Sequence, residues 1–586
     1  MQIYRAPIQE MKFLLEAFGY DQVSALPAYS DFDLDTTVAM LEQAGTFASE
    51  VLLPINRVGD KQGLRWDAAT GDVTTPPGFK EAYARMVENG FVGICGDREF
   101  GGGGGPITLA TFLNEFWISG NKSFSMCLGL SQGLIDALEM HANEEQKRAY
   151  LGKLVTGEWA GTMCLTEPQA GTDLGLVRTK AEPDGDRHRL TGNKIWITFG
   201  EHDFTENIVH FVLARLPDAP PGIKGISTFV VPKITSDGKR NNIKCAGLEH
   251  KMGIHASPTC VMDLDGAEGW LVGEPHRGMR AMFTMMNGAR LLVGVEGIAL
   301  GEISYQTALA FAKERRQSRA LDPDKRDRNE PADNILVHPD VRRMLLNIKA
   351  SNEAMRGLAC WVSINIDLSR HHPDEQVRQE ADDLVALLTP IVKSYCTERG
   401  FFNISEAMQL CGGAGYTADM CIEQYLRDER IAMIYEGTNH VQALDLVGRK
   451  LPRDGGRAFQ VFCKRLGAFI AEHAKHPELG PLAKELDKSL GRLMALTGEF
   501  GAKAMADPEM AGAAASNYLN LFALTALGYC WCVQAAYALA QGGARAQTKL
   551  KTARYFFDML MPEAEALERM IRAGKEPIMS FAVDEL

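Results

Sequence analysis

Four short runs rich in β-branched residues interrupt an otherwise helical chain, and this change of pattern constrains the fold most. The runs are HRLTGNKIWIT, NIVHFVLARL, GISTFVVPKI and TCVMDL, and Gly, Pro, Asn and Asp bound them. Such runs are typical of strands, whereas flanking stretches such as DTTVAMLEQAGTFASEVL follow the helical period. The sequence therefore predicts a mainly α protein with a β domain in its middle.

Turn-rich breaks divide the chain further. They predict an N-terminal helical domain over residues 1–160, the β domain over 161–280 and a four-helix domain over 281–452. One of the long helices in the third domain contains Pro390, where we expect a kink. After the break KLPRDGG, residues 457–586 are predicted to form an appended helical domain.

Composition excludes several classes of protein. The chain has 586 residues and a net charge of -13, which argues against a general nucleic-acid surface. Its 12 cysteines show no paired Cys-x-x-Cys spacing, so we expect no metal site. Acidic residues interrupt the apolar part of the N-terminus, unlike a signal peptide. A cytoplasmic, reduced protein is the expectation.

The stretch Met510 to Ala544 contains no charged residue and is long enough to span a bilayer. It is also rich in Ala and Gly, includes Asn517, Asn520 and Gln534, and lacks a strongly basic flank. We therefore favour a central helix of a bundle, with membrane contact as the less favoured alternative.

Two segments of the β domain could contact a polar, planar ligand. MCLTEPQAGTDLG, Met163 to Gly175, is a small-residue loop that offers backbone amides and the hydroxyls of Thr166 and Thr172. NKIWITFG places Trp196 and Thr198 on one face of a strand. The alternatives are an ordinary connecting loop with a capping residue and a tryptophan packed in the core.

Two arginines mark the long helix after the β domain. Arg290 and Arg315 are 25 positions apart, which corresponds to about 37 Å along a helix. They cannot bind one phosphate within a subunit, and surface ion pairing is the alternative. The run GAGYTA formally fits a dinucleotide-binding pattern, but it follows a helix rather than a strand, so we interpret it as a helix end.

Glu436 lies between an apolar run and an amphipathic helix in RIAMIYEGTNHVQALDLVGRK. A carboxylate there could simply stabilise the start of the helix. It could instead be a general base in a water-poor pocket, where desolvation would raise its pKa toward neutrality.

Five motifs in one order resemble the acyl-CoA dehydrogenase family over roughly residues 40–450. They are TEPQAGTD, NKIWIT, FAKERRQ, QLCGGAGY and RDERIAMIYEGTNHVQ. The resemblance implies a helical domain, a β-barrel-like middle domain and a four-helix domain, with FAD between the last two. It also implies oxidation of an acyl-CoA thioester to the trans-2-enoyl-CoA. Glu436 would be the catalytic base that removes the α-proton.

The same resemblance implies two sets of binding residues. Those that would bind FAD, some of them in a neighbouring subunit, are Met163, Leu165, Thr166, Gly171, Thr172, Trp196, Thr198, Arg315, Gln317, Gln409, Gly412, Gly413, Thr438 and Asn439. Those that would bind substrate are Thr172, Arg290, Tyr435 and Gly437. The family usually continues Arg-x-Gln with Phe-Gly, whereas Ser318 and Arg319 follow here, so we expect looser cofactor contacts at this point.

The tail from about residue 455 resembles that of the longer family members, which implies a homodimer with an electron-transfer flavoprotein as electron acceptor. Among these, MQIYRAPIQEMKFLLEAF and HPDVRRMLL resemble bacterial proteins of dimethylsulfoniopropionate breakdown. They imply 3-(methylthio)propanoyl-CoA, or another short- or medium-chain acyl-CoA, as the substrate. The alternatives are a straight-chain dehydrogenase of β-oxidation, an acyl-CoA oxidase and a non-catalytic scaffold.

Overall fold

The computed structural model describes residues 2–586, apart from the side chains of residues 287 and 502–505. The chain forms two compact units. We call the first the β unit; it contains Ala44–Pro106 and Phe116–Leu292. The helical unit contains the described residues up to Gln43, then Ile107–Glu115 and Val293–Leu586. The predicted fold class, mainly α with a middle β domain, is confirmed.

The β unit is built on a seven-stranded sheet in the order β3-β6-β7-β9-β5-β4, with β8 paired to β9. Strands β3 and β6 are parallel and the other pairs are antiparallel. The strands are β3 Trp159–Cys164, β4 Lys180–Asp184, β5 Arg187–Thr198, β6 Asn207–Ala214, β7 Ser227–Pro232, β8 Ile243–Leu248 and β9 Thr259–Val272.

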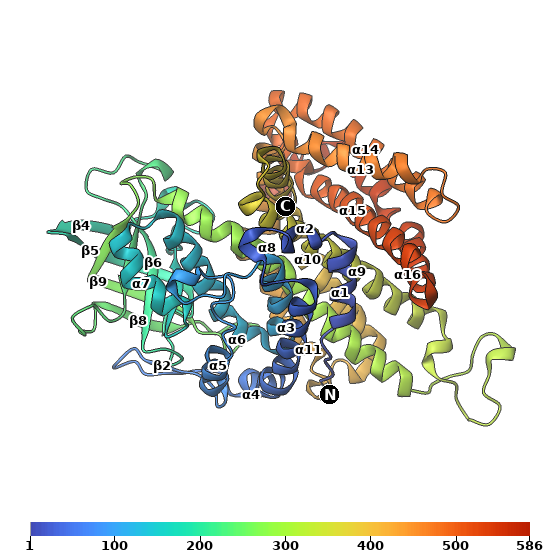
Figure 1. Ribbon diagram of the computed structural model, residues 1–586, viewed down its shortest axis with the longest axis horizontal. Coiled ribbons are helices and arrows are strands. Elements are labelled where there is room, and N and C mark those ends of the chain that lie inside the picture. Colours follow the sequence, from blue (N-terminus) through green and yellow to red (C-terminus); the bar gives the residue numbers. More distant parts are fainter. Residues whose placement is uncertain (1) are drawn as a thin grey trace. The chain divides into compact units, whose positions relative to one another are not determined.

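Strands β6 and β7 are apolar along most of their length because both faces of the sheet are covered there. Every residue of both strands is buried. Phe211 of β6 packs in a core with Leu134 and Leu151, whereas Val212 points into a second core with Phe229 and Leu264. Helix α7, Glu144–Val155, lies against the sheet in Figure 1. The alternation of strand side chains therefore fills one core on each face.

The remaining elements of the β unit include a short antiparallel pair, β1 Arg65–Trp66 and β2 Val73–Thr74, that the sequence did not predict. Its register joins two residues of each strand, too few for a periodic pattern. The helices are α4 Leu53–Gln62, α5 Phe79–Glu88 and α6 Ile107–His141, whose first residues belong to the helical unit.

The helical unit contains the long helices of the chain and the appended segment (Figure 1). Its helices are α1 Ile8–Ala17, α2 Asp21–Ser24, α3 Leu34–Phe47, α8 Gly278–Glu314, α9 Pro339–His371, α10 Glu375–Cys411, α11 Ile422–Glu429, α12 Asn439–Asp445, α13 Arg457–His473, α14 Gly480–Ala506, α15 Pro508–Gln541, α16 Gly543–Tyr555, α17 Glu563–Ala573 and α18 Glu576–Met579. Helix α3 ends, and α8 begins, in residues assigned to the β unit. Helix α10 continues through Pro390 and ends at the predicted glycines, where Gly412 has a φ of +59°.

Helices α8 and α10 approach each other closely at glycines. A Cβ added to Gly297 would lie 2.1 Å from the carbonyl oxygen of Cys396, and one added to Gly400 would lie 2.4 Å from the Gly297 Cα. Side chains of any size are therefore excluded at this crossing, which fixes the spacing of the two backbones.

The uncharged stretch of the sequence forms α15, and it packs against α9, α10, α12, α14, α16 and α17. Among the described residues, α15 is the one helix that is long and apolar enough to cross a membrane. However, 83% of its most apolar window is buried inside the protein. Trp531 is fully buried, and its indole nitrogen donates a hydrogen bond to the Ala350 carbonyl in α9 at 3.0 Å. The favoured interpretation, a central helix of a bundle, is confirmed.

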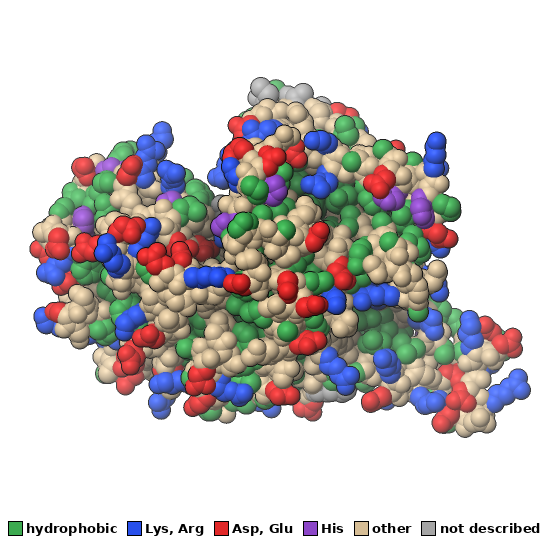
Figure 2. Space-filling model, viewed as in Figure 1, with side chains coloured by type: hydrophobic (Ala, Val, Ile, Leu, Met, Phe, Trp, Pro, Cys, Tyr) green, Lys and Arg blue, Asp and Glu red, His purple; other side chains and the backbone are tan. Residues whose placement is uncertain are grey.

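Charged side chains of both signs are interspersed over the face of the protein that Figure 2 shows. The cysteines are free thiols. Cys530 and Cys532 are fully buried in α15 and pack in the core.

Candidate active site

A buried ion pair joins the loop after β3 to strand β5. Lys194 Nζ lies 2.8 Å from Glu167 Oε1, with both side chains shielded from solvent, and also donates to the Leu165 carbonyl at 3.0 Å. The amide of Ile195 donates to the Thr166 carbonyl at 2.9 Å. The two predicted segments, Met163 to Thr172 and Trp196 to Thr198, are thus held side by side within the β unit.

Trp196 lies in an irregular part of β5, where the register against β9 shifts between Lys194 and Ile197. Its φ of +60° is a left-handed conformation that a bulky residue rarely adopts. The side chain is 59% exposed, and Thr198 is partly exposed two residues on. A strained, exposed indole beside a hydroxyl fits a planar heterocycle such as the flavin of FAD, which can stack on the ring and bond at its edge.

The other predicted FAD residues of the loop differ in what they present. Leu165 is buried in the core and Met163 packs against that core, so a ligand at this loop would meet the backbone of these two residues rather than their side chains. Gly171 and Thr172 are exposed. Asp173 caps the next turn by accepting from the Gly175 amide at 2.9 Å, as the alternative reading of this loop predicted.

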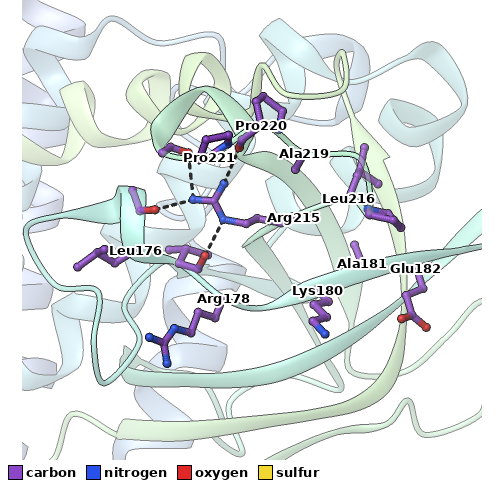
Figure 3. A pocket seen from close by; sticks show the side chains of 14 residues that line it. Leu176, Arg178, Lys180, Ala181, Glu182, Arg215, Leu216, Ala219, Pro220 and Pro221 are labelled. Atoms are coloured by element: carbon purple, nitrogen blue, oxygen red, sulfur yellow. Dashed lines mark hydrogen bonds between the residues drawn. The ribbon is translucent and has the colours of Figure 1, made fainter.

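A hollow of about 820 Å³ lies beside the same loop (Figure 3). The partly buried Arg215 guanidinium, one of its lining groups, donates to four backbone carbonyls. These belong to Gly175 at 2.6 Å, Val177 at 2.7 Å, Gly222 at 3.0 Å and Pro220 at 3.1 Å. Arg215 therefore fastens the loop after Thr172 to the turn between β6 and β7.

The β unit is expected to lose stability in acid as Glu167 takes up a proton. Burial alone would raise the pKa of Glu167, but the Lys194 ammonium and neighbouring hydroxyl and amide donors lower it to about 2. Glutamate in an unfolded chain has a pKa of about 4.3. The stabilisation that ionised Glu167 gives the folded β unit is therefore complete above that pH and is lost as the pH falls toward 2. Unfolding midpoints between pH 7 and 3 should fall more steeply in the wild type than in Glu167→Gln. Parallel profiles would contradict this prediction.

Glu436 lies in a strained turn of the helical unit. Its φ is +54°, and the following Gly437 also has a positive φ of +80°. The side-chain amide of Gln442, fully buried in α12, donates to the carbonyls of Glu436 and Gly437 at 3.0 and 3.4 Å. A left-handed glutamate held in this way indicates a functional constraint on the position of its carboxylate.

The residues after Glu436 begin α12 and dock it on α10. Thr438 caps the helix, since its hydroxyl accepts from the Val441 amide at 3.3 Å. The Asn439 side chain accepts from Lys393 Nζ at 3.0 Å and donates to the Ser394 carbonyl at 3.1 Å. Because Thr438 is the cap, Glu436 is not needed to start the helix, which disfavours the simpler explanation of this acid.

Tyr435 anchors the other side of the turn. Its hydroxyl donates to Glu296, lying 2.6 and 2.5 Å from the two carboxylate oxygens. Burial and then the Glu296 carboxylate hold the pKa of Tyr435 well above its ordinary value. The hydroxyl therefore remains a donor at neutral pH.

The remaining predicted residues lie elsewhere. Arg290 is 5% exposed in the part of α8 that belongs to the β unit. Arg315 and Gln317 lie beyond the end of α8 and contact each other at 3.3 Å. Arg315 follows Glu296 by 19 positions, about 28 Å along a helix, so one subunit does not bring it to Glu436. Gln409, Gly412 and Gly413 are exposed at the end of α10.

Four protein-family models match successive segments of the chain. Residues 35–158, 162–267 and 276–451 match the N-terminal, middle and C-terminal domains of acyl-CoA dehydrogenase, and residues 462–582 match a model described as acetyl-CoA dehydrogenase C-terminal like. The 3-methylmercaptopropionyl-CoA dehydrogenase of Ruegeria pomeroyi is 42% identical over 96% of this chain and 97% of its own length. The chain belongs to the acyl-CoA dehydrogenase family.

Two further acyl-CoA dehydrogenases resemble it. The broad-specificity linear acyl-CoA dehydrogenase FadE5 of Mycobacterium tuberculosis is 35% identical over 85% of this chain and 84% of its own length. The structure of an acyl-CoA dehydrogenase complexed with FAD from Bacillus anthracis shares the fold with a TM-score of 0.76 at 20% identity, covering 94% of this chain and 90% of that one. Members of the acyl-CoA dehydrogenase family bind FAD.

Several residues that shape the site of this acyl-CoA dehydrogenase were missed from the sequence. Glu167 and Lys194 lie inside the quoted motifs, where a Glu and a Lys in adjoining β segments were the signal. Glu296 is the single charged residue in LLVGVEGIALG, a conspicuous acid in an apolar helix. Gln442 had no signal beyond its place in α12.

Proposed function

We propose that this protein removes the α-proton of an acyl-CoA thioester with Glu436 as the base. The observation that carries the proposal is the left-handed turn that Gln442 and Tyr435 hold around this carboxylate. An α-proton of a thioester is weakly acidic, so the base must be held within hydrogen-bond reach of it. The backbone amide of Glu436 is proposed to donate to the thioester carbonyl, where negative charge develops.

FAD, when bound, supplies the acceptor for the β-hydrogen as hydride. We propose that Trp196 covers the flavin, that Thr166 and Thr198 bond its edge, and that the backbone from Met163 to Thr172 lines it. The exposed positions Arg315, Gln317, Gln409, Gly412 and Gly413 are proposed to reach the cofactor of a second copy in a homodimer. The Thr438 side chain caps α12 and the Asn439 side chain bonds α10. We therefore propose that these two residues support the turn that carries Glu436, rather than contacting the flavin through these groups.

The proposed substrate is 3-(methylthio)propanoyl-CoA. Its support is the Ruegeria pomeroyi relative, which matches nearly the whole of both chains, appended domain included. A second candidate is a straight-chain acyl-CoA, favoured by the similarity to the broad-specificity linear enzyme. For either substrate we propose Arg290, Thr172, Tyr435 and Gly437 as binding residues. The proposed setting is the cytoplasm, with an electron-transfer flavoprotein as the acceptor.

The test is anaerobic loss of flavin absorbance near ~450 nm on mixing with thioesters, because the cofactor itself reports its reduction. The panel is 3-(methylthio)propanoyl-CoA, butyryl-CoA, octanoyl-CoA and palmitoyl-CoA. Fastest bleaching by the methylthio substrate is the expected result. Faster bleaching by the straight-chain thioesters would move the assignment to fatty-acid oxidation, and no bleaching by any would contradict the proposed reaction.

Reoxidation separates a dehydrogenase from an oxidase. After reduction by substrate, admission of air should return the flavin absorbance slowly, and an electron-transfer flavoprotein should return it quickly. Rapid return in air alone would assign the protein as an acyl-CoA oxidase.

A further inference from the structure

Glu296 is a buried carboxylate to which the mechanism gives no direct part. It lies in the apolar run of α8 and is 5% exposed. The Tyr435 hydroxyl reaches both of its oxygens, across 139 positions of sequence. Burial of a carboxylate is costly unless it is hydrogen-bonded, so its presence in this apolar stretch of α8 calls for a role.

The backbone that carries Glu296 is fixed. Its neighbour Gly297 is where α8 touches α10, and Gly294 is similarly close, since an added Cβ would lie 2.5 Å from a Val392 side-chain carbon. Two backbones at such spacing cannot slide without a clash. Glu296 is therefore a rigidly placed acceptor for the Tyr435 hydroxyl.

The same helix α10 fixes the other end of the turn. Lys393 and Ser394 bind the Asn439 side chain, and so does Thr397, one helical turn later. Residues 435–439 are thus held at Asn439 by α10 and at Tyr435 by α8, and Glu436 lies between the two attachments. Gln442 adds a third contact from α12.

We propose that Glu296 is a positioning residue for the base: by accepting from the Tyr435 hydroxyl it holds the left-handed turn that aims the Glu436 carboxylate at the substrate. This inference rests on the proposed role of Glu436. The proposed effect of Glu296 passes through Tyr435 and needs no contact of Glu296 with substrate or cofactor. Displacing a catalytic group by about 1 Å can slow a reaction about 100-fold.

The experiment compares anaerobic flavin reduction in the FAD-loaded full chain for Glu296→Ala, Glu296→Gln and Tyr435→Phe. We expect Glu296→Ala and Tyr435→Phe to slow reduction at saturating substrate about 10- to 100-fold. KM should change by less than about threefold, because the Tyr435 hydroxyl bonds Glu296 and both variants keep the ring that would contact substrate. Glu296→Gln should recover most of the rate, since its amide oxygen can accept from the tyrosine. The double variant Tyr435→Phe/Glu296→Ala should be no slower than Tyr435→Phe, because both changes remove one contact.

Fold and flavin content are monitored by circular dichroism and by the ratio of flavin to protein absorbance, with Glu380→Ala on the surface of α10 as the matched control. Tyr435→Phe removes a single hydroxyl and keeps the test valid if Glu296→Ala does not fold. A wild-type rate in Tyr435→Phe, additive losses in the double variant, or a change in KM alone would each overturn the proposal. Glu436→Gln is measured in parallel: if it is inactive while Tyr435→Phe is normal, the base stands and only the positioning role fails.

Discussion

Glu436→Gln is expected to leave FAD bound and to abolish its reduction by acyl-CoA. The substitution is nearly isosteric but removes the basic carboxylate, and loss of a general base costs about 100- to 10,000-fold in rate. Gln442 bonds backbone carbonyls of the turn rather than the Glu436 side chain, so the left-handed turn should remain. Stopped-flow absorbance near ~450 nm under anaerobic conditions gives the rate directly.

The control is Glu423→Gln, which changes the same residue type 13 positions earlier. Glu423 is paired with Arg427, one turn later in α11, at 2.8 Å, and both side chains are partly exposed. Pairs of this i,i+4 kind contribute about 0.3–0.5 kcal/mol. Its flavin reduction rate should equal that of the wild type. Bleaching at a normal rate by Glu436→Gln would refute the assignment of the base, whatever the control does.

Arg356→Met is expected to destabilise the helical unit by about 3–5 kcal/mol, the typical cost of leaving a buried charge without its partner. The guanidinium is 2% exposed and lies within 2.9 Å of both oxygens of Glu115 in α6. It also reaches Glu302 in α8 at 2.7 Å. Burial raises the pKa of Glu115. When its cation is lost, either this carboxylate takes up a proton or the helical unit unfolds. Urea denaturation followed by circular dichroism measures the shift in midpoint.

Two variants make the expectation about Arg356 specific. Arg343→Met, which breaks the pairs of this α9 residue with Asp340 and with the partly exposed Glu406, should shift the midpoint by about 0–1 kcal/mol for each pair. Arg356→Met combined with Glu115→Leu should recover part of the loss, because the stranded acid is then removed. Equal shifts in the two arginine variants would contradict the prediction, because the buried cluster would then contribute no more to the free energy of unfolding than the pairs of Arg343.

Local pattern was sufficient for most elements. The predicted strand HRLTGNKIWIT covers all of β5 except its first residue, and the predicted long helix that contains Pro390 is α10. The left-handed conformation of Trp196 and the short β1–β2 pair were not predictable, since both depend on neighbours distant in sequence. The four-domain boundaries remain a prediction.

The candidate site also contains residues that the sequence predicted and partners that it did not. Motifs located Glu436 and the β-unit loop, and a resemblance assigned their roles, which remain predictions. The partners that hold these residues were not foreseen. Glu296 meets Tyr435 only when α8 is packed, and Glu167 meets Lys194 only when the loop returns to β5. Such pairings leave no periodicity in a single sequence.

Because of helix α15, the appended segment is not a separately packed accessory domain. It packs against α9 and α10, and its Trp531 bonds the backbone of α9, so the appended segment and the four-helix domain bury one continuous apolar surface. Without this segment, the faces of α9 and α10 that pack against α15 would be exposed to water. The appended segment is therefore an integral part of the same compact unit as these helices.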